Sequence, residues 1–339
     1  MSVIKTIHNP ALDYKNKDFD FVAKKTKSSN TKNQTTIISL FSGCGGMDLG
    51  FIGGFHFLGK HYKPTGFKII WANEINTAAC KTYRKNLGNH IVEGDISNEF
   101  NNMPAYADII IGGFPCQDIS INGKMVGING ARSGLYTNIV KAVNRVKPKA
   151  FVVENVGGLL LKQHKDSFNK ILGDFHSLGY NLNYQLYNAE NYGVPQTRQR
   201  VIFVGTRKDL VKFVPPKPIY KIPISAKTAL QDLESHPYDK EFSHIWSEAK
   251  ASAEQGNRKL LADRAGYTIR AECHGNIQFH YSLPRRISMR EAARIQSFPD
   301  SFVFPCGLRE TERQIGNAVP PVLAWHIANS VKSILNENI

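Results

Sequence analysis

Cys116 is the residue of this sequence whose type and position first suggest chemistry. It follows the apolar run ADIIIGGFP at residues 107–115. An isoleucine-rich run predicts a buried strand, and the two glycines and the proline predict its abrupt end. The thiol would then lie on a loop at the carboxyl end of a strand, where open α/β sheets bind ligands. Most cysteines are small buried hydrophobic residues, so this position by itself makes Cys116 only a candidate nucleophile.

Charged side chains accompany two other predicted strands. Glu154 follows the run AFVV at residues 150–153, and burial there would raise its pKa, which suits a proton donor. Arg198 and Arg200 alternate just before or within a later strand, so their side chains would share one face. Two guanidinium groups on one face suit a phosphate or the polar edge of a base. A capping acid and an exposed basic strand would give the same patterns.

A glycine-rich segment, FSGCGGMD at residues 41–48, follows the first predicted strand. Glycines let backbone N–H groups approach a ligand closely. Counted from Gly43, the sixth position is Asp48, so the G-x-G-x-x-G pattern of dinucleotide dehydrogenases fails. Glu74 ends the second strand, where a carboxylate can accept from ribose hydroxyls, and Asp95 ends the third, where it can reach an adenine edge. Three such strand ends predict a cofactor with an adenosyl group.

All these residues need a sheet whose strands end at one edge. Helices are predicted near 76–86, 135–146 and 167–178, and strands at 35–41, 67–72, 91–92, 108–111, 150–153 and 200–204. This alternation predicts an α/β fold with a doubly wound, mostly parallel sheet. Periodicity weakens after about Lys217. Helical patterns return at 288–295 and again at 322–335, after two prolines that suit a helix start.

Composition divides the chain into three parts. Residues 1–34 carry seven lysines and no clear apolar period, which predicts a flexible basic arm. Residues 35–225 and 307–339 form the predicted catalytic, cofactor-binding domain. Residues 226–306 mix polar, aromatic and basic residues, and they are predicted to form a second, smaller domain with its hinge.

The bulk composition narrows the class of protein. Lys plus Arg number 43 against 28 for Asp plus Glu in 339 residues, a net charge of +15. This excess favours a polyanion partner, nucleic acid before an anionic membrane, although an inert basic surface would also fit. Five scattered cysteines without a CxxC pair predict neither a metal site nor a disulfide framework. No membrane-length apolar run or signal-peptide core is present, so a cytoplasmic setting is expected.

Taken in order, these motifs resemble those of bacterial DNA (cytosine-5) methyltransferases of restriction–modification systems. The resemblance runs from Ile38 to about Ile327. Besides the glycine loop and the two acids, it rests on GFPCQ at 113–117, ENV at 154–156, QTRQR at 196–200, REAARIQSFP at 290–299 and QIGNAVPP at 314–321. Two features depart from the family pattern: Ile75 stands where an aromatic residue is common, and the chain between residues 53 and 64 is longer than in compact members.

The resemblance implies S-adenosylmethionine as the methyl donor and a Rossmann-like methyltransferase sheet. Its cofactor-binding motifs match Phe41, Ser42, Gly43, Cys44, Gly45, Gly46, Glu74, Ile75, Asp95, Ile96, Pro115, Leu135, Asn317, Ala318 and Val319. The implied catalytic residues are Cys116, Glu154, Arg198 and Arg200. The implied substrate contacts are Gln117, Ser120, which we expect at a target phosphate, and Asn155.

The implied reaction gives each catalytic residue a role. The Cys116 thiolate would add to C6 of cytosine and make C5 nucleophilic. Glu154 would hold or supply a proton at N3 and bond the exocyclic amine, while Arg200 would orient the O2 carbonyl. Arg198 would support the loop or Glu154. The base must be flipped out of the duplex, and the glycine-bearing segment 117–134 is predicted to close over it.

Residues 226–285 are predicted to read sequence in the major groove. Candidate base-reading residues are Arg270, Glu272, His274, Asn276 and Gln278. We expect double-stranded DNA as the partner, a cognate restriction endonuclease as a second partner, a monomer, and a bacterial cytoplasmic location on the nucleoid. Two alternatives stay open, a transfer RNA cytosine-5 methyltransferase and a noncatalytic DNA-binding partner.

Overall fold

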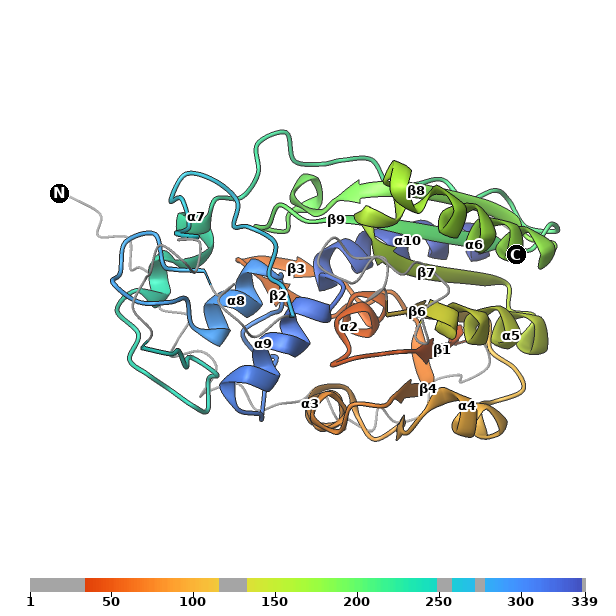
Figure 1. The fold of residues 1–339 in the computed structure, drawn as a ribbon, viewed down its shortest axis with the longest axis horizontal. Coiled ribbons are helices and arrows are strands. Elements are labelled where there is room, and N and C mark those ends of the chain that lie inside the picture. Colours follow the sequence, from red (N-terminus) through yellow and green to blue (C-terminus); the bar gives the residue numbers. More distant parts are fainter. Residues whose placement is uncertain (1–33, 116–132, 249–257, 272–277, 337–339) are drawn as a thin grey trace.

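The computed structural model describes residues 34–115, 133–248, 258–271 and 278–336. A seven-stranded sheet in the order β5-β4-β1-β6-β7-β9-β8 forms its centre (Figure 1). All neighbouring pairs are parallel except those of β9, which runs antiparallel to both β7 and β8. The predicted mostly parallel α/β sheet is therefore confirmed. The strands are β1 Thr36–Leu40, β4 Lys68–Glu74, β5 Ile91–Glu93, β6 Ile109–Gly113, β7 Ala150–Val156, β8 Asn181–Asn188 and β9 Gln199–Thr206.

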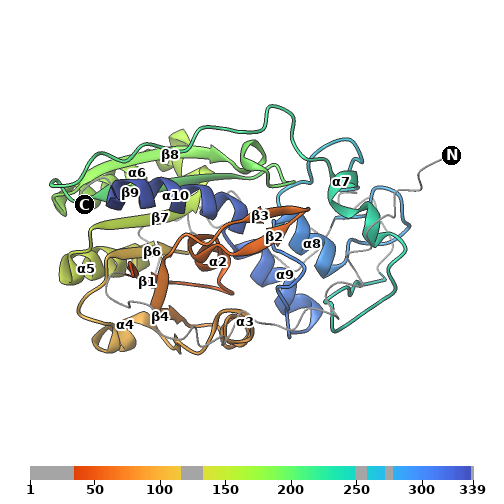
Figure 2. The same cartoon turned by 180° about the vertical axis from the view of Figure 1, so that it is seen from behind.

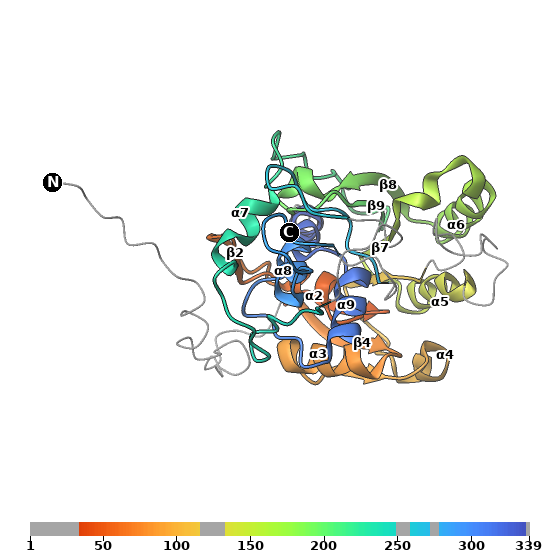
Figure 3. The same cartoon turned by 60° about the vertical axis from the view of Figure 1, so that its left-hand side comes forward.

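Helices cover both faces of this sheet, because successive side chains of a strand point to opposite faces. Ile37 of β1 lies in the core formed with α2, α3 and α10, whereas its neighbour Ile38 lies in the core formed with α4, α5 and α6. Figure 3 shows the second group together on one side of the sheet. The helices are α2 Gly46–Ile52, α3 Thr77–Leu87, α4 Ile96–Glu99, α5 Tyr136–Val146, α6 Lys165–Ser177 and α10 Pro321–Asn336.

The sequence analysis did not predict β8, α2, α9 (Leu308–Asn317) or the hairpin of β2 (Phe55–Phe57) and β3 (Lys60–Tyr62). The hairpin accounts for the extra length between residues 53 and 64. Its two turn residues, Leu58 and Gly59, have φ values of 44° and 76°, as a turn that matches the twist of its strands requires. The hairpin thus forms a separate two-stranded sheet beside the central one.

The chain between α7 and α8 lies beyond one end of the sheet (Figure 2). Residues 207–225 run back along the sheet to α7 (Ala226–Leu230), as Figure 2 shows. Apart from α7, the short helical turn η8 (Gln231–Leu233) and α8 (Met289–Ile295), the described residues of 226–306 are irregular. Leu230, Ile269 and Ile295 belong to the same hydrophobic cluster as α2 and α10. One core therefore runs through both parts, and the domain division at residues 226 and 306 stays a prediction.

Helix α8 is buried along its whole length, charged residues included. Arg294 contacts Asp232 and Asp300, each at 2.6 Å. Arg290 donates to the carbonyls of Phe242, Pro299 and Phe302. Buried charges are tolerated when their hydrogen bonds are satisfied in this way. The helix thus fixes the irregular chain around it. Among the described residues, no helix combines the length and the apolar character needed to cross a membrane.

Candidate active site

Glu154 and Arg200 form an ion pair at the carboxyl edge of the parallel strands. Because β9 runs antiparallel, it begins at the edge where β7 ends, and Arg200 lies opposite Val156. Nε of Arg200 is 2.7 Å from Oε1 of Glu154, and the two side chains are 11% and 10% exposed. Burial raises the pKa of Glu154, although the positive charges of Arg200 and Arg198 oppose this effect. The carboxyl group therefore lies close to an arginine. Because its pKa is raised, it keeps a proton to a higher pH than an exposed glutamate does.

The end of β6 is shaped to fit around this pair. Gly113 is the neighbour of Glu154 in the sheet, and a Cβ at Gly113 would lie 2.9 Å from Oε2 of Glu154. Nδ2 of Asn155, a residue that is 2% exposed, donates to the carbonyl of Phe114 at 3.2 Å. The amide thus holds the chain that leads from β6 to Cys116. A substrate contact of Asn155 stays a prediction.

The described residues do not include Cys116, Gln117 or Ser120. They also leave out most of the segment 117–134, which is predicted to cover the flipped base. Pro115, half-buried, is the last described residue before them. Its place at the end of β6 agrees with the predicted strand. The structure therefore describes the chain up to Pro115 and the pair of Glu154 and Arg200 at the same edge of the sheet.

Arg198 lies in a different environment from Arg200. It precedes β9, it is 1% exposed, and its guanidinium donates to the carbonyls of Ile269, Gly316 and Ala318 at 3.0, 2.7 and 3.1 Å. These carbonyls enclose the guanidinium of Arg198, so the prediction of a contact with a phosphate or a base is wrong for this residue. Its implied role as a support for the loop or for Glu154 stays a prediction. Alternation along the chain predicted a shared face but gave no information about distant carbonyl partners.

The glycine loop after β1 is tied to Glu74 at the tip of β4. The N–H of Gly43 donates to Oε2 of Glu74 and the N–H of Asn76 to Oε1, both at 2.9 Å. Burial raises the pKa of Glu74, and these backbone hydrogen bonds oppose that shift. A Cβ at Gly46 would lie 2.5 Å from the carbonyl of Val319. The glycine loop therefore touches residues 317–319. A contact of these residues with the cofactor stays a prediction.

Asp48 supports the glycine loop through buried hydrogen bonds. It is fully buried, and burial raises its pKa to about 6. It accepts from the hydroxyls of Ser39 at 3.0 Å and Tyr83 at 2.8 Å, and Ser39 in turn lies 2.9 Å from the hydroxyl of Ser42. The motif pointed to Asp48, but its partner Tyr83 lies on α3 and carried no signal in the sequence.

The other predicted cofactor residues differ in exposure. Ile75 is 65% exposed. Asp95 is exposed and accepts from the N–H of Ser97 at 2.7 Å. Cys44 and Ile96 point into the two cores, so only their backbone atoms are available to a ligand. The rest lie in or beside the loops at this edge. Phe41 and Leu135 are half-buried, and Gly45 is buried with a φ of 95°. Asn317 is exposed and Ala318 is 9% exposed.

The predicted base-reading residues also differ. Gln278 is 2% exposed and its Nε2 donates to the carbonyl of Tyr267 at 3.0 Å. That prediction is wrong for Gln278, because its side chain faces the interior. Arg270 is half-buried and forms no hydrogen bond or ion pair with any described residue. Glu272, His274 and Asn276 lie outside the described residues.

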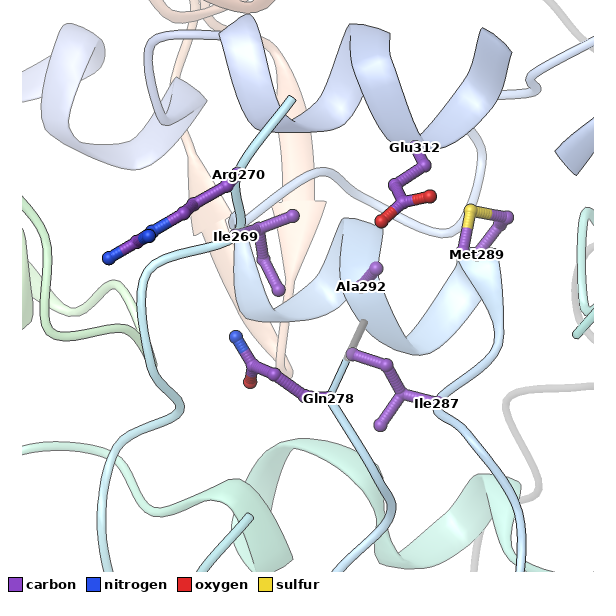
Figure 4. A pocket seen from close by; sticks show the side chains of 7 residues that line it. All are labelled: Ile269, Arg270, Gln278, Ile287, Met289, Ala292 and Glu312. Carbon is purple, nitrogen blue, oxygen red and sulfur yellow. The ribbon is translucent and has the colours of Figure 1, made fainter. Parts of the chain in front are cut away.

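Gln278 and Glu312 line a cavity of about 10 Å³ between α8 and α9, and Figure 4 shows the Arg270 guanidinium turned away from Glu312. Burial raises the pKa of Glu312 from its ordinary 4.5 to about 7. Between these values the folded state keeps a proton that the unfolded chain has released. The stability that Glu312 contributes is therefore complete below pH 4.5 and is lost as the pH rises through about 7.

We expect Glu312→Gln to raise the free energy of unfolding by about 1–2 kcal/mol at pH 8, because the amide carries no buried charge. At pH 4 the variant and the parent should unfold alike. Urea denaturation at both pH values measures the difference. Glu310→Gln, in the same helix but half-exposed beside Arg313, is the matched control. An equal gain at both pH values would contradict the assignment to Glu312.

A doubly wound sheet with a glycine loop and acids at successive strand tips defines the class of α/β methyltransferases. Comparisons with known proteins agree. The sequence model of the C-5 cytosine-specific DNA methylase family matches residues 35–274 and 247–333. A solved structure of a candidate DNA modification methyltransferase from an Escherichia coli prophage has the same fold, with a TM-score of 0.68 at 24% identity. The match covers 89% of this chain and 99% of that one.

Two Type II methyltransferases are similar along most of their length. M.NgoFVII of Neisseria gonorrhoeae is 36% identical over 346 residues, which cover 91% of this chain and 90% of that protein. M.FnuDI of Fusobacterium nucleatum is 34% identical over 338 residues, with 89% and 95% covered. This chain belongs to the C-5 cytosine-specific DNA methylase family. It is a DNA (cytosine-5) methyltransferase, and its methyl donor is S-adenosylmethionine.

The residues at the sheet edge fit the adenosyl part of this donor. Each oxygen of Glu74 accepts one backbone N–H, and a carboxylate oxygen can accept a further bond from a ribose hydroxyl. Ile75 beside it exposes 65% of its surface, which offers an apolar contact to adenine. One oxygen of Asp95 is engaged by Ser97, so the other is available to the adenine amine. A contact of Ile75 with adenine stays a prediction.

Proposed function

We propose that this enzyme methylates C5 of a flipped cytosine within a specific duplex DNA sequence. The observation that carries the proposal is the buried pair of Glu154 and Arg200, 2.7 Å apart at the end of β7. It lies beside the strand end that leads to Cys116. A carboxyl group that keeps a proton and a guanidinium that donates two hydrogen bonds match the N3 and O2 edge of cytosine.

The roles of the side chains follow from the chemistry of the base. S-adenosylmethionine, when bound, supplies an electrophilic methyl group on its sulfonium sulfur. Cys116, as a thiolate, forms a bond to C6 and so raises the electron density at C5. Glu154 holds a proton at N3 and accepts from the exocyclic amine, while Arg200 donates to O2. After methylation the C5 proton leaves to a base or water and the bond between C6 and sulfur breaks, which frees Cys116.

The substrate is inferred to be a duplex that opens locally. The target atoms of a stacked base are out of reach of protein groups, so the cytosine must leave the helix. The net charge of +15 favours the phosphate backbone, and the basic arm 1–34 would add to this attraction. The segment 117–134 would close over the flipped base, with Ser120 on a phosphate and Gln117 near the base.

Residues 226–306 are proposed as the part that recognises sequence. Arg270 is the candidate that the structure leaves open, because its guanidinium has no partner among the described residues. An arginine can bond O6 and N7 of guanine in the major groove. The enzyme is proposed to act as a monomer in the bacterial cytoplasm, on the nucleoid, and a cognate restriction endonuclease is proposed as its companion.

The test of this function is tritium transfer from labelled S-adenosylmethionine. Duplex DNA and transfer RNA are offered to the purified full chain in parallel. Label in DNA alone is the expected result, whereas label in RNA alone would favour the transfer RNA alternative and overturn the proposal. Label in neither would favour a noncatalytic DNA-binding protein. Bisulfite sequencing of DNA from cells that express the chain then identifies the modified cytosine and its context.

Replacing Glu74 with alanine is expected to weaken cofactor binding. The substitution removes the acceptor that holds the N–H groups of Gly43 and Asn76. Hydrogen bonds to a charged group contribute about 1.5–3 kcal/mol, so Kd for S-adenosylhomocysteine should rise by about 10- to 100-fold. Isothermal titration calorimetry measures this change. Glu93→Ala, at the neighbouring strand tip, is the control, and equal weakening in both variants would contradict a specific role of Glu74.

A further inference from the structure

Three buried polar side chains lie between the recognition part and the cofactor edge. They are Gln196, Arg198 and Gln296, which are 0%, 1% and 0% exposed, and we refer to them as the polar clamp. They connect three pieces of chain that are far apart in the sequence: the start of β9, the segment 266–270 and residues 316–318. We refer to residues 316–318 as the closing segment. Each of the three side chains forms hydrogen bonds, although Nε of Arg198 has no partner among the described residues. Buried polar networks of this kind favour one defined geometry.

On the recognition side, the clamp holds the backbone of Ile269 by both of its hydrogen-bonding groups. Oε1 of Gln196 accepts from the N–H of Ile269, and Nη1 of Arg198 donates to its carbonyl, each at 3.0 Å. Thr197 donates to the carbonyl of Gly266 at 2.8 Å, and Gly266 donates back to Pro195 at 2.9 Å. Arg270, the open candidate for DNA contact, directly follows this fixed residue.

On the cofactor side, the same clamp holds the closing segment. Nη2 of Arg198 donates to the carbonyls of Gly316 and Ala318, at 2.7 and 3.1 Å. Nε2 of Gln296 donates to Ala318 at 2.5 Å, and Gln196 bonds the side chain of Gln296. The next residue, Val319, touches the glycine loop, since a Cβ at Gly46 would lie 2.5 Å from its carbonyl. The clamp therefore reaches the wall of the cofactor site.

The two sides cannot move independently of each other. The guanidinium group of Arg198 is planar and its N–H directions are fixed. If Ile269 moved alone, Arg198 would lose its hydrogen bond to Ile269 or its hydrogen bonds to the closing segment. The backbones also touch directly, because a Cβ at Gly316 would lie 2.4 Å from the carbonyl carbon of Arg270. A buried arginine that loses carbonyl partners is strongly disfavoured. The clamp thus favours one joint arrangement of both segments.

We propose that Arg198 is a positioning residue that couples the cofactor site to the DNA site. Cofactor binding fixes the closing segment, and DNA binding fixes the segment that carries Arg270. Each event favours the same arrangement of the clamp, so each ligand tightens the binding of the other by one shared factor. Arg200 lies two residues further along, so the same arrangement also sets the guanidinium at the base. This inference rests on the proposed function for the identity of the nucleic acid.

The test measures two ligands on the full chain. The dissociation constant of a duplex carrying the methylated site is determined with and without saturating S-adenosylhomocysteine, and that of S-adenosylhomocysteine with and without the duplex. We expect the parent to show the same tightening in both directions, about 10-fold. Arg198→Lys keeps the charge but loses the planar fork. Its coupling factor, the ratio of the dissociation constants of one ligand without and with the other, should fall below about threefold, whatever the change in the affinity for each ligand alone.

Arg207→Lys, just after the other end of β9 and paired with Asp209, is the control and should keep the full coupling. A parent without coupling, or an Arg198→Lys variant with undiminished coupling, would overturn the proposal. If Arg198→Lys melts too low to assay, Gln296→Met decides. It removes the bonds of Gln296 to Ala318 and to Gln196 and should lower the coupling partly, and undiminished coupling in this variant would overturn the proposal. If transfer RNA is the substrate, the proposed function fails, and the same titrations with transfer RNA still test the clamp.

Discussion

Replacing Cys116 with serine is expected to lower methyl transfer to DNA by on the order of 10⁴-fold or more. A serine hydroxyl is not ionised near neutral pH and is a far weaker nucleophile than a thiolate. Because the substitution exchanges one atom and leaves the predicted cofactor residues in place, S-adenosylhomocysteine should bind Cys116→Ser within about threefold of the parent. Single-turnover tritium transfer to duplex DNA measures the loss. The buried and half-buried cysteines elsewhere in the fold should not share this effect.

Cys306→Ser is the matched control, since its Sγ contacts the carbonyl of Ala78 and not the sheet edge. A duplex with 5-fluorocytosine at the target adds a direct readout of the covalent step. Fluorine cannot leave C5 as a proton leaves, so the bond between C6 and sulfur should persist and the parent should accumulate a denaturation-resistant adduct. An adduct of equal yield in Cys116→Ser, or unchanged methylation, would falsify the assigned nucleophile.

The strands that carry these residues are predictable from sequence because helices cover both faces of the sheet. Strands buried on two faces read as continuous apolar runs, and β1, β6 and β7 show such runs. Strand β8 is a partly exposed edge strand, and of its residues only Tyr187 is buried, so its sequence gives no such run. Gly50 of α2 packs against α10, where a Cβ would meet Ala324 at 2.4 Å. Glycine in a helix weakens the helical signal, which explains that omission.

Some residues of the site can be placed from the sequence close to them, whereas the surroundings of others depend on distant segments. Glu74 and Glu154 end apolar runs, so their positions at the sheet edge follow from the chain near them. Arg198 is similar to Arg200 in sequence, yet its partners Ile269 and Ala318 lie 71 and 120 residues away. Only the packing of three distant segments determines that it is enclosed. Sequence therefore predicts which groups reach the edge, but not which of them remain available to a ligand.

The second large effect is expected from Glu154→Gln, which should lower the methylation rate constant by about 10²- to 10³-fold. The amide can still bond Arg200 and the base, but it cannot hold or release the N3 proton. Burial raises the pKa of Glu154. The active form is the protonated one, so the rate constant of the parent should fall as the pH rises through that pKa. Ionisation of Cys116 acts in the opposite direction, which gives a bell-shaped profile.

In Glu154→Gln the falling limb should disappear and only the rise with Cys116 ionisation should remain, because an amide does not titrate. Single-turnover rates on duplex DNA with saturating cofactor, taken over the whole pH range in which the enzyme stays folded, measure both limbs. Asp209→Asn removes the acid of an exposed arginine pair, Arg207 with Asp209, and should leave the profile unchanged. A falling limb that survives in Glu154→Gln would assign it to another group. A parent profile without that limb would exclude Glu154 as the group that holds the proton at N3.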